Sequence, residues 1–79
     1  MSEGIWDWRV IVDEVKNYVK KYQVYPNIAI IYYIMRKEYG WKTKRIKFAI
    51  KKAIDKLYLE IDRMGRLRLI DWEEKVIEK

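Results

Sequence analysis

The sequence contains no cysteine and no histidine, and it has one proline and three glycines among its 79 residues. Without cysteine no disulfide can support the fold, and without either side chain a zinc ion would have only carboxylate ligands, which structural zinc sites do not use. The usual pairing of a nucleophile with a base is missing for the same reason. The composition therefore predicts that the protein is not an enzyme and that it uses no metal, cofactor or small-molecule ligand.

Long apolar runs are also missing. No stretch approaches the roughly 18 apolar residues that could span a bilayer, and the first residues lack the basic start and apolar centre of a secretory leader. We therefore expect an intracellular, cytoplasmic protein without membrane contact. Because no linker rich in proline or glycine divides the chain, residues 1–79 should form a single domain.

Apolar packing must stabilise so small a domain. The sequence is 51% hydrophobic and contains four tryptophans and seven tyrosines, and each such side chain can bury roughly 150–250 Å². The charged fraction is also high, at 38%. Abundant isoleucine, lysine, glutamate and tyrosine are typical of heat-stable proteins, so we expect a thermostable domain.

The excess positive charge is confined to one stretch. Residues 42–56 carry seven basic side chains against one acid, Asp55, and the resulting +6 equals the net charge of the whole chain. A cationic helix face without balancing acids indicates an anionic partner, and the phosphate backbone of DNA is the best candidate. The same lysines would also suit RNA. The simpler alternative is that the lysines form only a solvated face.

Two segments before the basic stretch show helical periodicity. Apolar residues recur every three or four positions over about residues 6–22, and residues 28–39 are apolar almost all round. Asn27 should cap the second helix and Gly40 should end it, with Trp41 folding back against that end. The packing face of the first helix should consist of Trp8, Ile11, Val12, Val15, Val19 and Tyr22.

A third helix should contain the basic stretch. Thr43 is a plausible N-cap, and the helical pattern continues to about residue 57. One face should pack against the rest of the domain, and the opposite side should present lysines to solvent. The packing face consists of Ile46, Ile50, Ala53 and Leu57.

Extended segments are predicted at two places. Val24 and Tyr25, before the single proline, could form a very short strand. After the third helix the pattern changes to strict alternation, and Gly65 stands where a three-residue hairpin loop needs a left-handed residue. The hairpin register then pairs Leu59 with Leu69, Glu60 with Arg68, Ile61 with Leu67 and Asp62 with Arg66.

A final short helix is predicted at the C-terminal end, over residues 72–79. Asp71 would cap it, with Glu74 as the return partner of a capping box. The expected fold is thus mainly α with a small β-hairpin, in the order helix, short strand, helix, basic helix, hairpin and short helix.

The stretch GWKTKRIKFAIKKAIDKLYLEIDRMGRLRLI resembles the recognition helix and wing of the winged-helix, or winged helix-turn-helix, DNA-binding family. The resemblance extends over nearly the whole chain. Size and composition are also similar to those of small winged-helix regulators carried by viruses and plasmids of thermophilic archaea. The resemblance implies a transcriptional regulator that binds double-stranded DNA, with the third helix in the major groove and the wing on the backbone or the minor groove.

The resemblance also implies which side chains meet DNA. Arg45 alone in the basic segment can make a bidentate contact to guanine, whereas lysines suit phosphates. The wing tip would contribute Arg63, Met64 and Arg66. The third helix would contribute Lys42, Thr43, Lys44, Arg45, Lys47, Lys51 and Lys52.

Two alternatives stay open at this point. Phe48 lies among the lysines by helical geometry, where it could touch a thymine methyl group or instead cover the second helix or the wing. The second alternative concerns function, because winged-helix domains also serve as protein-interaction modules. Many of them dimerise, so a homodimer is compatible with the same pattern.

Overall fold

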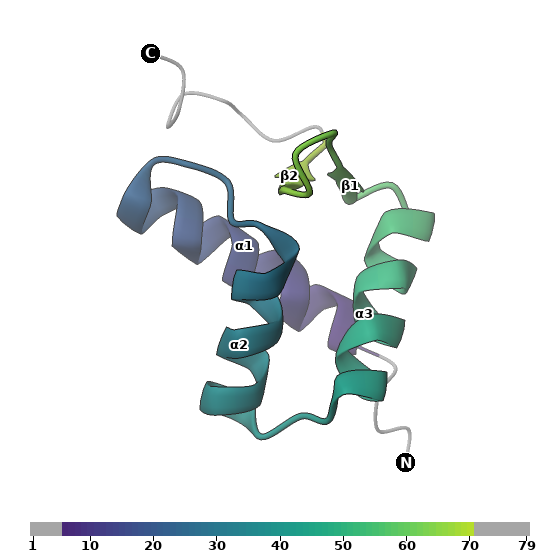
Figure 1. Cartoon of the computed structure of the whole chain (residues 1–79). Helices are drawn as coiled ribbons and strands as arrows, with labels where there is room; N and C mark the ends of the chain where they lie inside the picture. Colours follow the sequence, from purple (N-terminus) through teal and green to yellow (C-terminus); the bar gives the residue numbers. More distant parts are fainter. Residues whose placement is uncertain (1–5, 71–79) are drawn as a thin grey trace.

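The computed structural model describes residues 6–70 and shows three helices followed by a β-hairpin (Figure 1). Its mainly helical α+β class agrees with the expectation, whereas the final helix predicted after Asp71 lies outside the described residues. Within residues 6–70, no helix has the length and apolar character needed to cross a membrane. The elements are α1 (Asp7–Tyr22), α2 (Ile28–Tyr39), α3 (Thr43–Asp55), β1 (Leu59–Ile61) and β2 (Leu67–Leu69).

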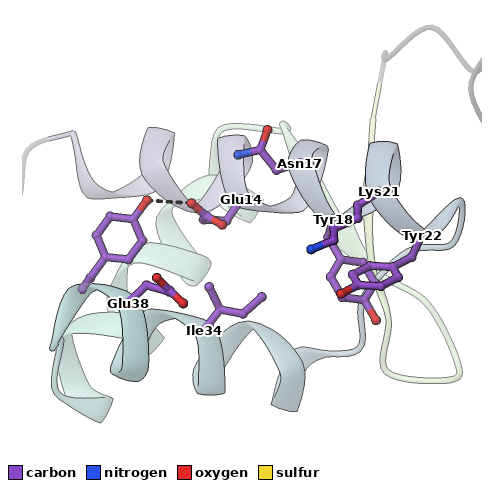
Figure 2. A pocket seen from close by; sticks show the side chains of 8 residues that line it. Glu14, Asn17, Tyr18, Lys21, Tyr22, Ile34 and Glu38 are labelled. Atoms are coloured by element: carbon purple, nitrogen blue, oxygen red, sulfur yellow. Dashed lines mark hydrogen bonds between the residues drawn. The ribbon is translucent and has the colours of Figure 1, made fainter.

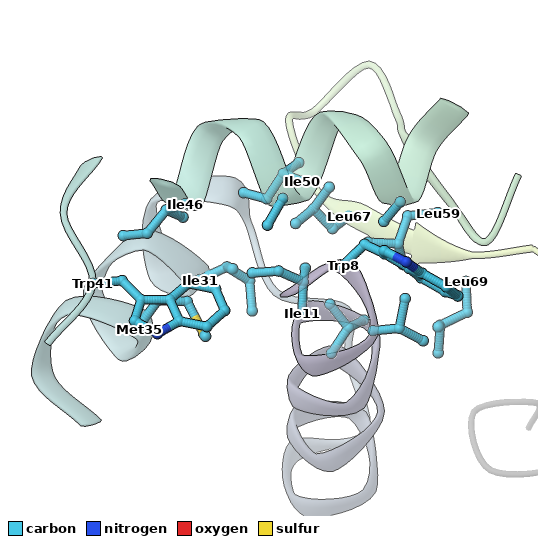
Figure 3. Packing of buried hydrophobic residues seen from close by; sticks show 14 of the residues in the cluster. Trp8, Ile11, Ile31, Met35, Trp41, Ile46, Ile50, Leu59, Leu67 and Leu69 are labelled. Carbon is cyan, nitrogen blue, oxygen red and sulfur yellow. The ribbon is translucent and has the colours of Figure 1, made fainter. Parts of the chain in front are cut away.

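The hydrophobic core surrounds α1, which packs against α2, α3 and β2 and runs behind the two later helices in Figure 1. Figure 3 shows Trp8 toward one end of this core and Trp41 toward the other. Fully burying an aliphatic side chain stabilises a fold by roughly 1.5–3 kcal/mol. The core cluster consists of the buried residues Trp8, Ile11, Val12, Val15, Val19, Ile31, Met35, Trp41, Ile46, Ala49, Ile50, Ala53, Leu59, Leu67 and Leu69.

The first two helices have the predicted boundaries. The side chain of Asn27 accepts a hydrogen bond from the backbone N–H of Ala29 at 2.8 Å, so Asn27 caps α2 as expected. Gly40 ends α2 with a left-handed φ of 68°, which glycine adopts without steric cost. The backbone N–H of Trp41 then donates to the carbonyl of Met35 at 3.2 Å, which brings the indole back into the core.

The prediction that Tyr22 belongs to the packing face of α1 is wrong. Its side chain is 53% exposed, and its ring lies 4.6 Å from that of Tyr18 on the surface. Tyr22 instead lines an open hollow together with Tyr18, Ile34 and Tyr39.

The end of α3 also differs from the expectation. The helix stops at Asp55, and Leu57 is 69% exposed with a left-handed φ of 66° instead of packing with Ile50. The N–H of Tyr58 donates to the carbonyl of Ala53 at 3.0 Å, which closes the helix end. The chain reverses here so that the next strand can bury Leu59.

The hairpin has the predicted register, with Leu59 opposite Leu69, Glu60 opposite Arg68 and Ile61 opposite Leu67. Gly65 closes the three-residue loop with a φ of 81°. Strict alternation and the loop glycine together explain why the register could be predicted, because a slip by one residue would turn the buried leucines outward.

The short strand predicted at Val24 and Tyr25 is absent from the described part of the chain. The pairing instead falls on Asn27, which forms an isolated antiparallel bridge with Arg66. The carbonyl of Pro26 accepts from the N–H of Leu67 at 2.8 Å. Proline cannot donate to a ladder, and α2 begins directly after the bridge, so pairing ends after one residue.

Candidate nucleic-acid interface

The helix α3 separates apolar from cationic side chains. Ile46, Ala49, Ile50 and Ala53 are buried, because positions three and four apart share one face of a helix. The lysines between them lie on the opposite, exposed side. The structure therefore brings one cluster of predicted residues together on the surface of α3 and the residue before it. These residues are Lys42, Thr43, Lys44, Arg45, Lys47, Phe48, Lys51 and Lys52, and all of them are exposed.

An open depression of about 650 Å³ lies on this face, lined by Lys42, Lys44, Arg45, Lys47, Phe48 and Lys51. Phe48 is 65% exposed. Since most of its surface meets solvent, Phe48 does not act as a cover for α2 or the hairpin. Lysine side chains combine apolar alkyl stems with a charged end that favours water, so such a lining can present apolar walls below a cationic rim.

Arg45 makes a bidentate contact inside the chain. Its Nε donates to Oδ2 of Asp7 at 2.7 Å, and its Nη2 donates to Oδ1 of the same carboxylate at 3.0 Å. The guanidinium carbon lies 4.2 Å from the ring centroid of Trp41, within the range of a cation–π contact. The edge of Arg45 that the sequence assigned to guanine is thus engaged by the carboxylate of Asp7 within the chain.

The first residues of the segment are arranged differently from the prediction. Lys42, with extended backbone, is the N-cap of α3, and Thr43 is the first helical residue. The hydroxyl of Thr43 accepts a hydrogen bond from Nη2 of Arg36 at 2.6 Å. This bond ties the last turn of α2 to the first turn of α3 and orients one helix relative to the other.

The hairpin turn over residues 63–65, which the sequence predicted as a wing tip, is tight and is held by Asp62. Its Oδ1 accepts from the backbone N–H of Met64 at 2.8 Å and from that of Arg66 at 3.0 Å. These two bonds, the one from Arg66 foremost, favour the ionised carboxylate and lower the pKa of Asp62. Arg63 is exposed, and Met64 is 72% exposed, so both side chains lie outward from an ordered turn.

Arg66 does not lie at the wing tip, which corrects the prediction. Its Nη1 donates to the backbone carbonyl of Tyr25 at 2.8 Å, and its side chain is half-buried. The loop has only three residues, so Arg66 already pairs with Asn27 beside the start of α2. Farther along the strand, Nη1 of Arg68 lies 3.6 Å from Oε2 of Glu60, as the register predicts.

A second hollow, of about 570 Å³, lies between α1 and α2 (Figure 2). There the hydroxyl of Tyr39 donates to Oε2 of Glu14 at 2.6 Å. This bond, partial burial and the nearby carboxylates raise the pKa of Tyr39 to about 12. Glu14 and Glu38 both line the hollow, with Lys21 among the other lining residues. The two carboxylates make this hollow less suited to an anionic partner than the cationic face of α3 is.

The contact between Asp7 and Arg45 could not be predicted from any pattern in the sequence. Asp7 and Arg45 are 38 positions apart, and only the packing of α1 against α3 brings them together. Trp41 could be placed at the helix end from the sequence, but its contact with Arg45 could not.

No protein-family model, curated protein or solved structure matches this chain.

Proposed function

We propose that the protein binds double-stranded DNA as a winged helix-turn-helix transcriptional regulator. In this proposal α3 enters the major groove and the hairpin lies against the backbone or the minor groove. The chain order supports it, because a helix-turn-helix consists of two helices joined by a short turn, the second of which enters the groove. Here α2 and α3 are joined by residues 40–42, and the hairpin follows α3 directly.

The observation that carries the proposal is the exposed cationic face of α3. Thirteen residues of helix extend about 20 Å, and the major groove, about 12 Å wide, admits an α-helix. Lysines on this face would reach phosphates on the groove edges. Because these side chains are mostly lysines, the face favours affinity over discrimination between bases, and we expect semi-specific binding.

Salt dependence of duplex binding tests the proposal. Each neutralised phosphate contributes about −0.9 to the slope of log affinity against log salt. If the exposed lysines 42, 44, 47, 51 and 52 each neutralise one phosphate, the slope should be about −4.5. Absence of duplex binding by this protein at low salt would contradict the proposal.

Charge reversal locates the interface. The double variant K44E/K47E should abolish binding without loss of folding, since both side chains are exposed on α3. The double variant K20E/K21E makes the same change of charge on exposed residues of α1 and should keep most of the binding. Equal losses in the two variants would indicate a general charge effect instead of an interface on α3.

A second candidate function is protein interaction, including self-association. The observation in its favour is Leu57, which is 69% exposed although leucine strongly prefers burial. It lines a hollow of about 330 Å³ that also includes Tyr58 and Ile70. Sedimentation at increasing protein concentration tests this candidate, and a monomer at every concentration would count against a homodimer.

A further inference from the structure

One residue on the outer face of α3 does not suit a purely electrostatic surface. Phe48 is 65% exposed, and a phenyl ring left in water forgoes most of the stabilisation that its burial would contribute. A lysine or glutamine at this position would serve a solvated helix face equally well. An aromatic ring there indicates an apolar contact with a partner.

The ring occupies the middle of the cationic face. Lys44 is four residues before Phe48, and Lys51 and Lys52 are three and four residues after it. Positions three and four apart are neighbours on a helix surface, so lysines flank the ring toward both ends of α3. Phe48 therefore lies where the helix would approach the floor of a groove, with cations placed toward its edges.

The other candidates for base contact on this face are less suited to it. The Nε and Nη2 edge of Arg45 is engaged by Asp7 at 2.7 and 3.0 Å. The lysines are point charges that suit phosphates better than base edges. In the major groove the apolar group that a base presents is the C5 methyl of thymine, and this is the chemistry that complements an exposed phenyl ring.

We propose that Phe48 is the base-contacting residue of α3 and selects A·T pairs by packing its ring against a thymine methyl group. This inference rests on the proposed function, because it requires α3 to enter the major groove. It adds a specificity-determining residue to a face whose other exposed side chains mainly provide charge.

The test compares two duplexes of the same sequence, one containing thymine and the other containing deoxyuridine throughout. The only chemical difference is the C5 methyl group. The wild-type protein should bind the thymine duplex about fourfold more tightly for each methyl contacted, which corresponds to about 0.8 kcal/mol for one buried carbon. The variant F48A should bind both duplexes equally.

The variant Y33A is the matched control. Tyr33 is an aromatic residue of α2 that is 61% exposed, and it lies outside the face described above, so Y33A should keep the preference for thymine. Thermal unfolding should show that F48A and Y33A fold like the wild type, because both side chains are exposed.

Three other outcomes would overturn the inference. If the wild type binds both duplexes equally, Phe48 does not contact the methyl group, although the proposed function stands. If the preference for thymine persists in F48A, it arises from the shape of the DNA. If neither duplex is bound at low salt, the proposed function and this inference both fail.

Discussion

Replacing Asp7 with alanine should weaken the fold and strengthen duplex binding at the same time. Asp7 joins the start of α1 to α3 through its bidentate contact with Arg45, so its removal takes away an interaction within the chain. The same change removes a negative charge from beside the cationic face. In the proposed function, the loss of this negative charge favours the approach of a phosphate to α3 beside Arg45.

The size of both effects follows from the geometry. Exposed ion pairs stabilise proteins by about 0.2–1 kcal/mol. The contact to Arg45 is bidentate, and the side chains of Asp7 and Arg45 are 13% and 41% exposed, so we expect a value near the upper end, about 1 kcal/mol. That loss lowers the melting temperature of a domain of this size by about 4–8 °C. One added phosphate contact makes the salt slope more negative by about 0.9.

A double-mutant cycle with D7A, R45A and D7A/R45A, followed by thermal unfolding, measures the pair. Asp7 also lies in the first turn of α1, where an acid favours the helix dipole, and the cycle separates that contribution from the pair. The losses of unfolding free energy in D7A and R45A, added together, should exceed the loss in D7A/R45A by about 1 kcal/mol. Simple additivity would show that the pair contributes nothing, and an unchanged salt slope in D7A would show that Arg45 does not reach phosphate.

Three further predictions concern stability and pH. Leu57→Gly should raise the unfolding free energy by up to about 1 kcal/mol, since a left-handed φ is unfavourable for leucine; a lower melting temperature would contradict this. The lowered pKa of Asp62 means that its contribution is complete above the unfolded value of about 3.9 and is lost as pH falls through the folded value. Asp62→Asn keeps the acceptor but should flatten the acid side of a melting-temperature profile. Tyr39, with its pKa raised to about 12, stabilises fully below the ordinary value of about 10 and loses this as pH rises through about 12. An absorbance titration of Tyr39→Phe should lack the latest tyrosinate transition.

The parts of the fold that could be predicted from the sequence are those determined by neighbouring residues. Asn27 and Gly40 mark the ends of α2 because a cap and a left-handed residue depend only on the adjacent backbone. The hairpin register was predictable because alternation and Gly65 act within a dozen residues. The same local logic placed the lysines of α3 on its outer face.

The errors arose where distant segments meet. Arg66 has the spacing of a wing-tip residue, but its guanidinium is held by the carbonyl of Tyr25, which is 41 positions away. Leu57 continues the apolar stripe of α3 in the sequence, but the chain turns at Lys56 so that the next strand can enter the core. The spacing of apolar residues indicates that a segment is helical, but it does not determine the residue at which tertiary packing ends the helix.

Phe48 shows how local and distant information combine at the candidate site. At about 100° per residue, Phe48 lies about 200° from Ile46, so the sequence already places it away from the packing stripe. Whether another element covers it depends on where α2 and the hairpin lie, which periodicity does not determine. The structure leaves the ring 65% exposed, while Asp7 engages Arg45. The arginine that the sequence favoured as the base-reading residue thus has a partner within the chain, and in our proposal the exposed phenyl ring makes the specific contact in its place.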